Sequence, residues 1–228
     1  MIDTTIMERV GGQIGSNPAS IYRDAQGKKY YVKTLESAAH ARNEWIAAKL
    51  YQLAGAPTLT YVPTLAQDQI ATEWVELDKR YIAHFNAEER EQAQQWFGVH
   101  AWTANWDAAG YEGDNQGVLG GTVLTLDVGG ALAFRAQGDP KGKAFGIEVN
   151  ELELLRRDEH NPHAVKLFGD MSAEQIAQAI GVVAAISDQQ IRSIIVENGG
   201  SEKLAEKMIA RKATMSDYLF SPNVDNIG

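Results

Sequence analysis

The chain of 228 residues contains no cysteine. This absence excludes disulfides, thiolate metal sites and a cysteine nucleophile, and it does not indicate a cellular compartment. No apolar run reaches the length of a membrane span, and the first residues, Met1-Ile2-Asp3-Thr4, lack the charged-then-apolar pattern of a signal segment. We therefore expect no membrane partner.

Positive charge is also in short supply. The 21 Lys and Arg residues against 30 Asp and Glu residues give a formal net charge of -9 at pH 7. Because proteins that bind nucleic acid in general need a basic face, we expect no nucleic-acid partner. The 44% hydrophobic content is ordinary for a globular core, and the length suits one compact domain, or one domain made of two lobes.

The hydrophobic pattern changes from sheet-like to helical along the chain. Residues 8–34 are typical of strands around turns, and the stretch from Ser37 to Leu53 has helical spacing, with Ser37 as its cap and Gly55 after its end. Further strands are expected at 59–62, 69–75, 117–119 and 122–126, and further helices at 87–105, 172–185, 187–198 and 201–212. This layout predicts an α+β protein of two lobes, with a ligand cleft between them.

A glycine-rich turn lies near the N-terminus, in the run Gly11-Gly12-Gln13-Ile14-Gly15-Ser16. Glycines let backbone N–H groups approach phosphate oxygens without a Cβ in the way, so this turn could form a flexible flap over a nucleotide. A plain hairpin loop is the simpler interpretation of the turn alone. It is not a Walker loop, because no Lys-Ser or Lys-Thr follows the last glycine.

Lys33 ends an aromatic strand, Tyr30-Tyr31-Val32-Lys33. A strand fixes the direction of the ammonium group, so Lys33 can point at phosphate oxygens, and a buried lysine needs a carboxylate partner. Glu44 shares a helix face with Ala41 and Ala48, which directs its carboxylate inward with the apolar stripe. We expect Glu44 to pair with Lys33; a glutamate on a solvated edge is the alternative.

An Asp, an Asn and a second Asp follow in order near turns. Asp107 comes after an apolar stretch, Phe97 to Trp106, where a well-held carboxylate could accept or orient a hydroxyl proton. Asn115 and Asp127 offer hard oxygen ligands for Mg²⁺, and a short hairpin between them would bring both to one point. Simple turn residues are the alternative for Asp107 and Asn115. Asp127 stands in an apolar run, where a buried unpaired carboxylate would cost too much to be accidental.

The glycine turn, the strand lysine, the helix glutamate and the Asp–Asn–Asp set, in this order, resemble the protein-kinase-like superfamily. The resemblance covers residues 8–170, and it points to compact phage-encoded and bacterial effector kinases, with relatives in the HipA-like and phosphatidylinositol-kinase-like groups. It implies a single kinase-like domain over residues 1–228. A small antiparallel β N-lobe with one helix would occupy about residues 1–77, and a mostly helical C-lobe would occupy about residues 78–228.

The resemblance also implies an ATP site and a catalytic site. The residues that it assigns to ATP binding are Gly11, Gly12, Gly15, Ser16, Lys33, Glu44, Glu73, Trp74 and Val75, of which the last three form the hinge that reads the adenine edge. Asp107 is implied as the catalytic aspartate, together with Lys33, and Asn115 and Asp127 as the Mg²⁺ ligands.

The sequence departs from the usual superfamily pattern in several places, and Glu44 follows Lys33 after only 11 residues, which implies an abbreviated N-lobe. Asn105-Trp106-Asp107 stands where His-Arg-Asp or Asn-Gly-Asp is usual. Asn115 follows Asp107 after eight positions in place of five, so Asp114 is an alternative to the preferred Asp107 for the catalytic role. Asp127-Val128-Gly129 replaces Asp-Phe-Gly, and no Ala-Pro-Glu segment follows.

These features predict an ATP- and Mg²⁺-dependent kinase that phosphorylates Ser, Thr or Tyr of a protein substrate. The alternatives are a small-molecule kinase, a catalytically inactive pseudokinase or nucleotide-binding interaction module, and nucleotidyl transfer by the same groups. The basic loop from Arg135 to Lys143 could be a plain surface loop; in a kinase it would occupy the segment that receives the acceptor. We expect a monomer that acts in the cytoplasm, or in a host cell if the protein is delivered as an effector.

Overall fold

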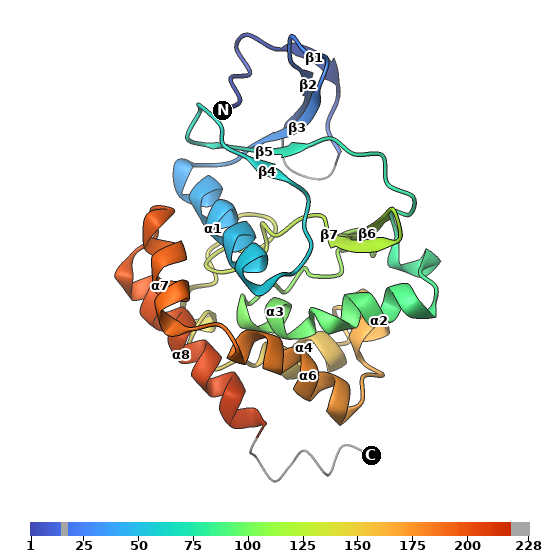
Figure 1. The fold of residues 1–228 in the computed structure, drawn as a ribbon, viewed down its shortest axis with the longest axis vertical. Coiled ribbons are helices and arrows are strands. Elements are labelled where there is room, and N and C mark those ends of the chain that lie inside the picture. Colours follow the sequence, from blue (N-terminus) through green and yellow to red (C-terminus); the bar gives the residue numbers. More distant parts are fainter. Residues whose placement is uncertain (15–17, 220–228) are drawn as a thin grey trace.

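The computed structural model describes residues 1–14 and 18–219, which fold into two lobes (Figure 1). The N-terminal lobe contains a five-stranded antiparallel sheet in which β3 is central and β1 and β4 lie at the edges. Along the sheet the strands are β1 (Glu8–Gly11), β2 (Ala19–Arg23), β3 (Lys29–Thr34), β5 (Gln69–Glu73) and β4 (Tyr61–Val62). The last two are shorter than the sequence predicts: residues 59 and 60 precede β4, and residues 74 and 75 leave the sheet after β5 and lead toward the second lobe.

Strand β3 presents alternate side chains to opposite faces of the sheet. Tyr30 and Val32 are buried in a small apolar cluster on one face. Tyr31 and Lys33 therefore point to the other face, where both line the cleft between the lobes. Because β3 is paired on both sides, by β2 and by β5, the direction of the Lys33 side chain is fixed by the sheet.

The helix of the N-terminal lobe, α1 (Ala38–Ala54), begins and ends as the sequence predicts. The Ser37 side chain accepts hydrogen bonds from the backbone N–H groups of Ala39 and His40, which are otherwise unpaired in the first turn. Gly55, with φ of 79°, ends the helix in the left-handed conformation that favours glycine. The helix contacts both β5 and α7 (Asp188–Glu197), so it connects the two lobes.

The second lobe is mostly helical (Figure 1). The prediction of one helix over 87–105 is wrong: α2 (Ala87–Gln95) and α3 (Phe97–Trp102) are separated at Trp96, whose φ of -95° and ψ of 4° lie outside the helical range. The remaining helices are α4 (Glu151–Arg157), α5 (Pro162–Phe168), α6 (Ala173–Ala184), α7 and α8 (Glu202–Tyr218). The helices predicted at 172–185 and 187–198 are confirmed as α6 and α7, and each begins with a capping box. Helix α8 continues past residue 212, where the sequence predicts its end.

A two-stranded hairpin, β6 (Gln116–Leu119) and β7 (Thr122–Thr125), lies at the junction of the lobes, as the sequence predicts. Its turn is Gly120-Gly121, with φ of 57° and 80°, values that suit a tight hairpin turn. The hairpin returns the chain to its starting point, where the Leu126 N–H donates to the Asn115 carbonyl over 2.9 Å. Single-turn 3-10 helices precede and follow this region, η1 (Ile82–His84) and η2 (Gly142–Ala144).

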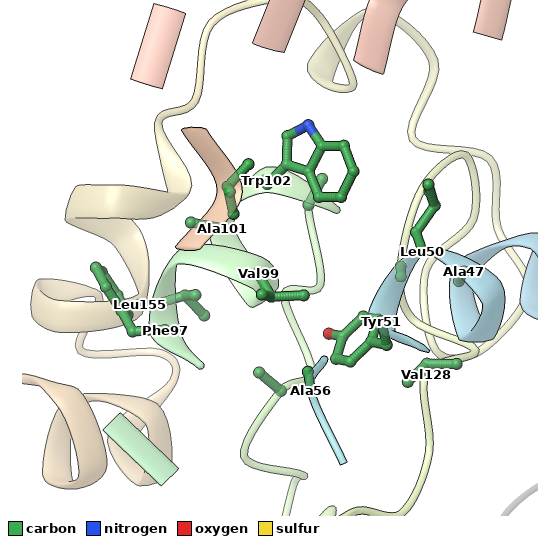
Figure 2. Packing of buried hydrophobic residues seen from close by; sticks show 14 of the residues in the cluster. Ala47, Leu50, Tyr51, Ala56, Phe97, Val99, Ala101, Trp102, Val128 and Leu155 are labelled. Carbon is green, nitrogen blue, oxygen red and sulfur yellow. The ribbon is translucent and has the colours of Figure 1, made fainter. Parts of the chain in front are cut away.

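The main apolar core fills the second lobe and continues onto α1, so that Leu50 and Tyr51 of that helix share one cluster with Trp102 (Figure 2). Val128 belongs to the same cluster, and this anchors the segment that follows Asp127. Among residues 1–14 and 18–219 no single helix is long and apolar enough to cross a membrane. The bent pair of α6 and α7, with 63° between them, passes that test only when the two helices are taken together.

Candidate active site

A cleft of about 220 Å³ lies between the lobes. The predicted site residues that line it are Lys33, Glu44, Glu73, Trp74, Val75, Asn115 and Asp127. Asp107 lies beside it, hydrogen-bonded to Asn115. The fold thus brings side chains from both lobes together, some of them 94 positions apart in the sequence.

Lys33 is held between two carboxylates at the inner end of the cleft. Its Nζ lies 2.7 Å from Glu44 Oε1 and 3.1 Å from Asp127 Oδ2. Burial lowers the pKa of the Lys33 ammonium, but the charges of Asp127 and Glu44 outweigh burial and raise the pKa above its ordinary value. Lys33 is therefore a cation at neutral pH, fixed by one acidic group from each lobe.

Glu44 is the innermost member of this set, with only 2% of its surface exposed. Burial raises the pKa of its carboxyl, and the charge of Lys33 opposes that effect. The Tyr61 hydroxyl donates to Glu44 Oε1 over 3.1 Å, which gives the carboxylate a second partner. A buried carboxylate so paired holds a lysine in one position, which is the role that the sequence predicts for Glu44.

Asp127 is oriented by the backbone that follows it. The Gly129 N–H donates to Asp127 Oδ1 over 2.7 Å, while Oδ2 faces Lys33. A Cβ at position 129 would lie 2.9 Å from Glu44 Oε2 and 3.0 Å from Asp127 Oδ1, so a side chain there would displace one of these two carboxylates. Although burial raises the pKa of Asp127, the Lys33 charge and the Gly129 N–H lower it below its ordinary value, and the carboxylate is ionised.

Asp107 and Asn115 form a second contact at the cleft. The Asn115 amide nitrogen donates to the Asp107 carbonyl over 2.8 Å and to Asp107 Oδ2 over 2.9 Å. Burial, with a contribution from the charge of Asp127, raises the pKa of the Asp107 carboxyl to about 6, although the Asn115 bond opposes this. A carboxylate with this pKa is mostly ionised at pH 7 and still basic enough to accept a proton.

Asp114, the alternative for the catalytic role, also lines the cleft but is exposed. Asp107, by contrast, is half-buried and is the aspartate to which the Asn115 amide is bonded. The geometry therefore favours Asp107 as the better oriented of the two groups.

Asn105 orients the backbone at Asp107, and the sequence did not assign it this role. It is completely buried; its Nδ2 donates to the Tyr51 hydroxyl over 3.0 Å, and its Oδ1 accepts from the Asp107 N–H over 3.2 Å. Tyr51 is bonded in turn to His100. The only signal in the sequence was the position of Asn105, two residues before Asp107, where the superfamily pattern usually has His or Asn.

The glycine-rich flap is only partly described. Gly15 and Ser16 lie outside the described residues. Of the described flap residues, Ile14 lines the cleft and its N–H donates to the Tyr31 hydroxyl over 3.0 Å, whereas Gly11 and Gly12 do not line it. Gly11 ends β1 at an irregularity in the pairing with β2, and a Cβ there would lie 2.8 Å from Ile21 Cδ1.

The predicted hinge runs along the outer side of the cleft. The Trp74 N–H donates to the Lys29 carbonyl over 3.0 Å, and its ring lies 6.5 Å from the ring of Tyr31. The Glu73 side chain forms an ion pair with Lys28. The apolar surfaces of Trp74, Tyr31 and Val75 thus form a wall of the cleft that suits a flat ring.

No family model and no curated protein matches this sequence. Among solved structures, the proinflammatory kinase CtkA of Helicobacter pylori aligns over 100% of this chain and 99% of its own, with 13% identity and a TM-score of 0.60. This chain has the kinase-like fold. The prediction of a small antiparallel N-lobe and a helical C-lobe is therefore confirmed.

Two further structures align at lower similarity, and both are phosphotransferases of small molecules by their names. An aminoglycoside phosphotransferase from Alicyclobacillus acidocaldarius has 11% identity and a TM-score of 0.40, covering 99% of this chain and 94% of its own. Amicoumacin kinase hAmiN, in complex with AMP-PNP, Ca²⁺ and Ami, has 10% identity and a TM-score of 0.43, covering 99% and 93%.

The kinase-like fold implies a divalent cation, and the oxygen atoms in the cleft fit one. The described residues contain no cluster of three or more His, Cys, Asp or Glu side chains that could hold a metal by itself. Mg²⁺ is usually held by one or two protein oxygens together with substrate phosphates. Asp127 would supply a charged oxygen to the cation. The Asn115 amide nitrogen donates to Asp107, so its amide oxygen is the atom that would supply a neutral ligand.

Proposed function

We propose that this protein is an ATP- and Mg²⁺-dependent phosphotransferase, and that it phosphorylates Ser, Thr or Tyr of a protein. The observation that carries the proposal is the position of Lys33. Its ammonium lies within 2.7 Å of Glu44 and 3.1 Å of Asp127, at the inner end of a cleft that has Asp107 and Asn115 beside it. A structural ion pair would not need a cleft or a second, separately oriented carboxylate.

Each residue has a distinct part in the proposed reaction. Lys33 binds phosphate oxygens of ATP, and Glu44 keeps its ammonium in place. Asn115 and Asp127 would hold Mg²⁺, which when bound would neutralise phosphate charge. Asp107 accepts a hydrogen bond from the acceptor hydroxyl, aligns its oxygen with the terminal phosphate and takes up the proton as the new O–P bond forms. ADP is the leaving group. Most of the rate enhancement would come from positioning and charge stabilisation.

The proposal is tested by incubating the protein with γ-labelled ATP, Mg²⁺ and a cell lysate. Label on protein that disappears for the Asp127→Asn variant would support it. Label on a small metabolite would show a small-molecule kinase instead, and label on neither would point to a nucleotide-binding module without turnover. A parallel incubation with α-labelled ATP identifies nucleotidyl transfer, since only that reaction leaves the α-phosphate on the acceptor. The same incubation with a cytoplasmic extract and with a lysate of a candidate host cell shows which of the two contains the acceptor.

A further inference from the structure

Lys141 lies at a junction beside the proposed active site. The sequence shows it inside a basic, turn-rich stretch, which suggested a plain surface loop or an acceptor segment. In the structure, Lys141 is 4% exposed, and its backbone N–H donates to the Ala133 carbonyl over 2.8 Å. The loop 134–140 is folded back on itself by a bridge between Phe134 and Pro140, so Lys141 stands at the base of that loop and its side chain points inward.

The Lys141 ammonium is bonded to three backbone carbonyls. Its Nζ donates to Ala104 O over 2.7 Å, to Gly130 O over 2.7 Å and to Leu132 O over 2.9 Å. An ammonium group has three N–H donors, so each donor has an acceptor here. It also lies 4.9 Å from the centre of the Trp106 ring.

These three carbonyls come from the two segments that hold the proposed catalytic groups. Ala104 precedes Asp107 by three residues, and Gly130 follows Asp127 by three residues. Ala104 and Leu132 are the non-glycine residues with positive φ in the described chain, at 52° and 58°. This conformation is strained for residues with a Cβ and persists only where the surroundings hold it.

A second contact shows how closely the two segments must fit. A Cβ at position 130 would lie 3.0 Å from the Asp107 Cβ and 3.2 Å from Asn105 Oδ1. A small shift of either segment would therefore change the separation of Asp107 and Asp127. The Lys141 side chain contacts both segments through these carbonyls.

From this geometry we infer that Lys141 is a positioning residue, which joins the Asp107 segment to the Asp127 segment through three backbone carbonyls and so sets the distance between the proposed catalytic and metal-binding groups. This inference rests on the proposed function. Burial lowers the pKa of the Lys141 ammonium to about 7, with the nearby charge of Glu151 opposing that effect. The three carbonyl acceptors favour the protonated form, because only that form has three donors.

The test compares Lys141→Met with a matched control, Lys207→Met. Methionine keeps the apolar stem and removes the donors. Lys207 is half-buried, and its ammonium also donates to one carbonyl, Phe145 O, and lies 4.4 Å from the ring of that residue, but it contacts neither segment. Turnover is measured by label transfer from ATP, nucleotide affinity with a fluorescent ATP analogue, and backbone opening by hydrogen–deuterium exchange.

We expect the turnover of Lys141→Met to fall by about 100-fold, as for a misplacement of reacting groups by about 1 Å. Its affinity for the nucleotide should change by less than about threefold, because the residues that line the nucleotide cleft keep their contacts. Amides in residues 103–107 and 128–132 should exchange faster. Lys207→Met should match the parent protein in all three measurements.

Parent-like turnover with unchanged exchange would overturn the inference. A parallel loss of turnover and nucleotide affinity, with faster exchange throughout the protein, would also overturn it, because it would show a general structural role. If the parent protein does not consume ATP, the proposed function fails, and the exchange data alone then decide whether Lys141 joins the two segments. If Lys141→Met does not fold, Lys141→Gln, which keeps two N–H donors, is measured in the same way.

Discussion

Lys33 Nζ and Glu44 Oε1 lie 2.7 Å apart and join the central strand of the sheet to the helix that contacts both lobes. Both side chains are buried, so this ion pair has little screening from water. The contact explains why a lysine and a glutamate are acceptable in an apolar interior, and it places the lysine where phosphate oxygens can reach it.

Removal of one partner should be more damaging to stability than removal of both. Lys33→Met leaves Glu44 buried without its cation, and we expect a loss of about 3 kcal/mol in the free energy of unfolding. The double variant Lys33→Met with Glu44→Gln should recover most of that loss while remaining inactive. Urea unfolding of the parent, both single variants and the double variant measures the coupling; additive effects would contradict a direct ion pair.

Asp107→Asn should lower turnover by about 10²- to 10⁴-fold, because an amide cannot accept the hydroxyl proton. Nucleotide affinity should stay near that of the parent, since Asp107 lies beside the cleft and Lys33 is unaffected. Asp114→Asn provides the comparison, because the two aspartates are the two candidates for one role. If Asp114→Asn loses turnover and Asp107→Asn retains it, the assignment is reversed.

The kcat/KM of the parent should fall as the pH drops below about 6, which is the pKa of the Asp107 carboxyl. The protonated carboxyl cannot accept the proton of the acceptor hydroxyl. A pH profile of kcat/KM at saturating Mg²⁺ measures this. A profile that stays level down to pH 5 would mean that Asp107 is not the proton acceptor.

The same pKa predicts an effect on stability. The pKa of the Asp107 carboxyl is about 6 in the folded protein and 3.8 ordinarily, so binding of this proton stabilises the folded state. This contribution to the free energy of unfolding is complete at low pH and is lost as the pH rises from about 4 to about 6. Asp107→Asn should therefore be more stable than the parent at pH 7, by about 1–2 kcal/mol after allowance for partial exposure, and not at pH 4. Urea unfolding without nucleotide at the two pH values tests this; an equal difference at both would contradict it.

Gly129→Ala should lower turnover by at least about 10-fold, because the new Cβ would displace Asp127 or Glu44, whose oxygens lie 3.0 and 2.9 Å from it. The matched control is Gly181→Ala in α6, where a Cβ meets no atom within 4 Å. That control should keep full activity and gain about 0.5–1 kcal/mol of stability, since glycine weakens a helix interior. Label transfer and thermal unfolding of both variants measure these effects, and equal activity of the two would show that the close approach at Gly129 is unimportant.

Local sequence patterns predicted much of this fold. The caps of α1 at Ser37 and Gly55 and the helices α6 and α7 depend on short-range features, and each is confirmed. The break at Trp96 between α2 and α3 was missed, because every residue near it is compatible with a helix.

The candidate site was only partly predictable from the sequence, because local patterns do not show which distant residues come together. Lys33, Glu44 and Asp127 stood out because charges in apolar runs need partners, and the interval between Asn115 and Asp127 is long enough for a short hairpin. Gly11 and Gly12 were predicted to belong to a flap over the nucleotide; of the described residues of that turn, Ile14 lines the cleft and these two glycines do not. The sequence suggested a surface loop or an acceptor segment for Lys141, and only its burial against three carbonyls reveals a different position.

Short-range patterns in the amino-acid sequence were enough to predict the two-lobed α+β class, most of the strands, several of the helices and the charges that needed burial partners. These follow from backbone conformation and from the cost of desolvating a charge, both of which act over a few residues. Two contacts could be seen only in the folded protein: Asn115 holds Asp107 and not Asp114, and Lys141 binds both the segment of Asp107 and the segment of Asp127. Those contacts depend on the packing of chain segments far apart in the sequence, which no local pattern specifies.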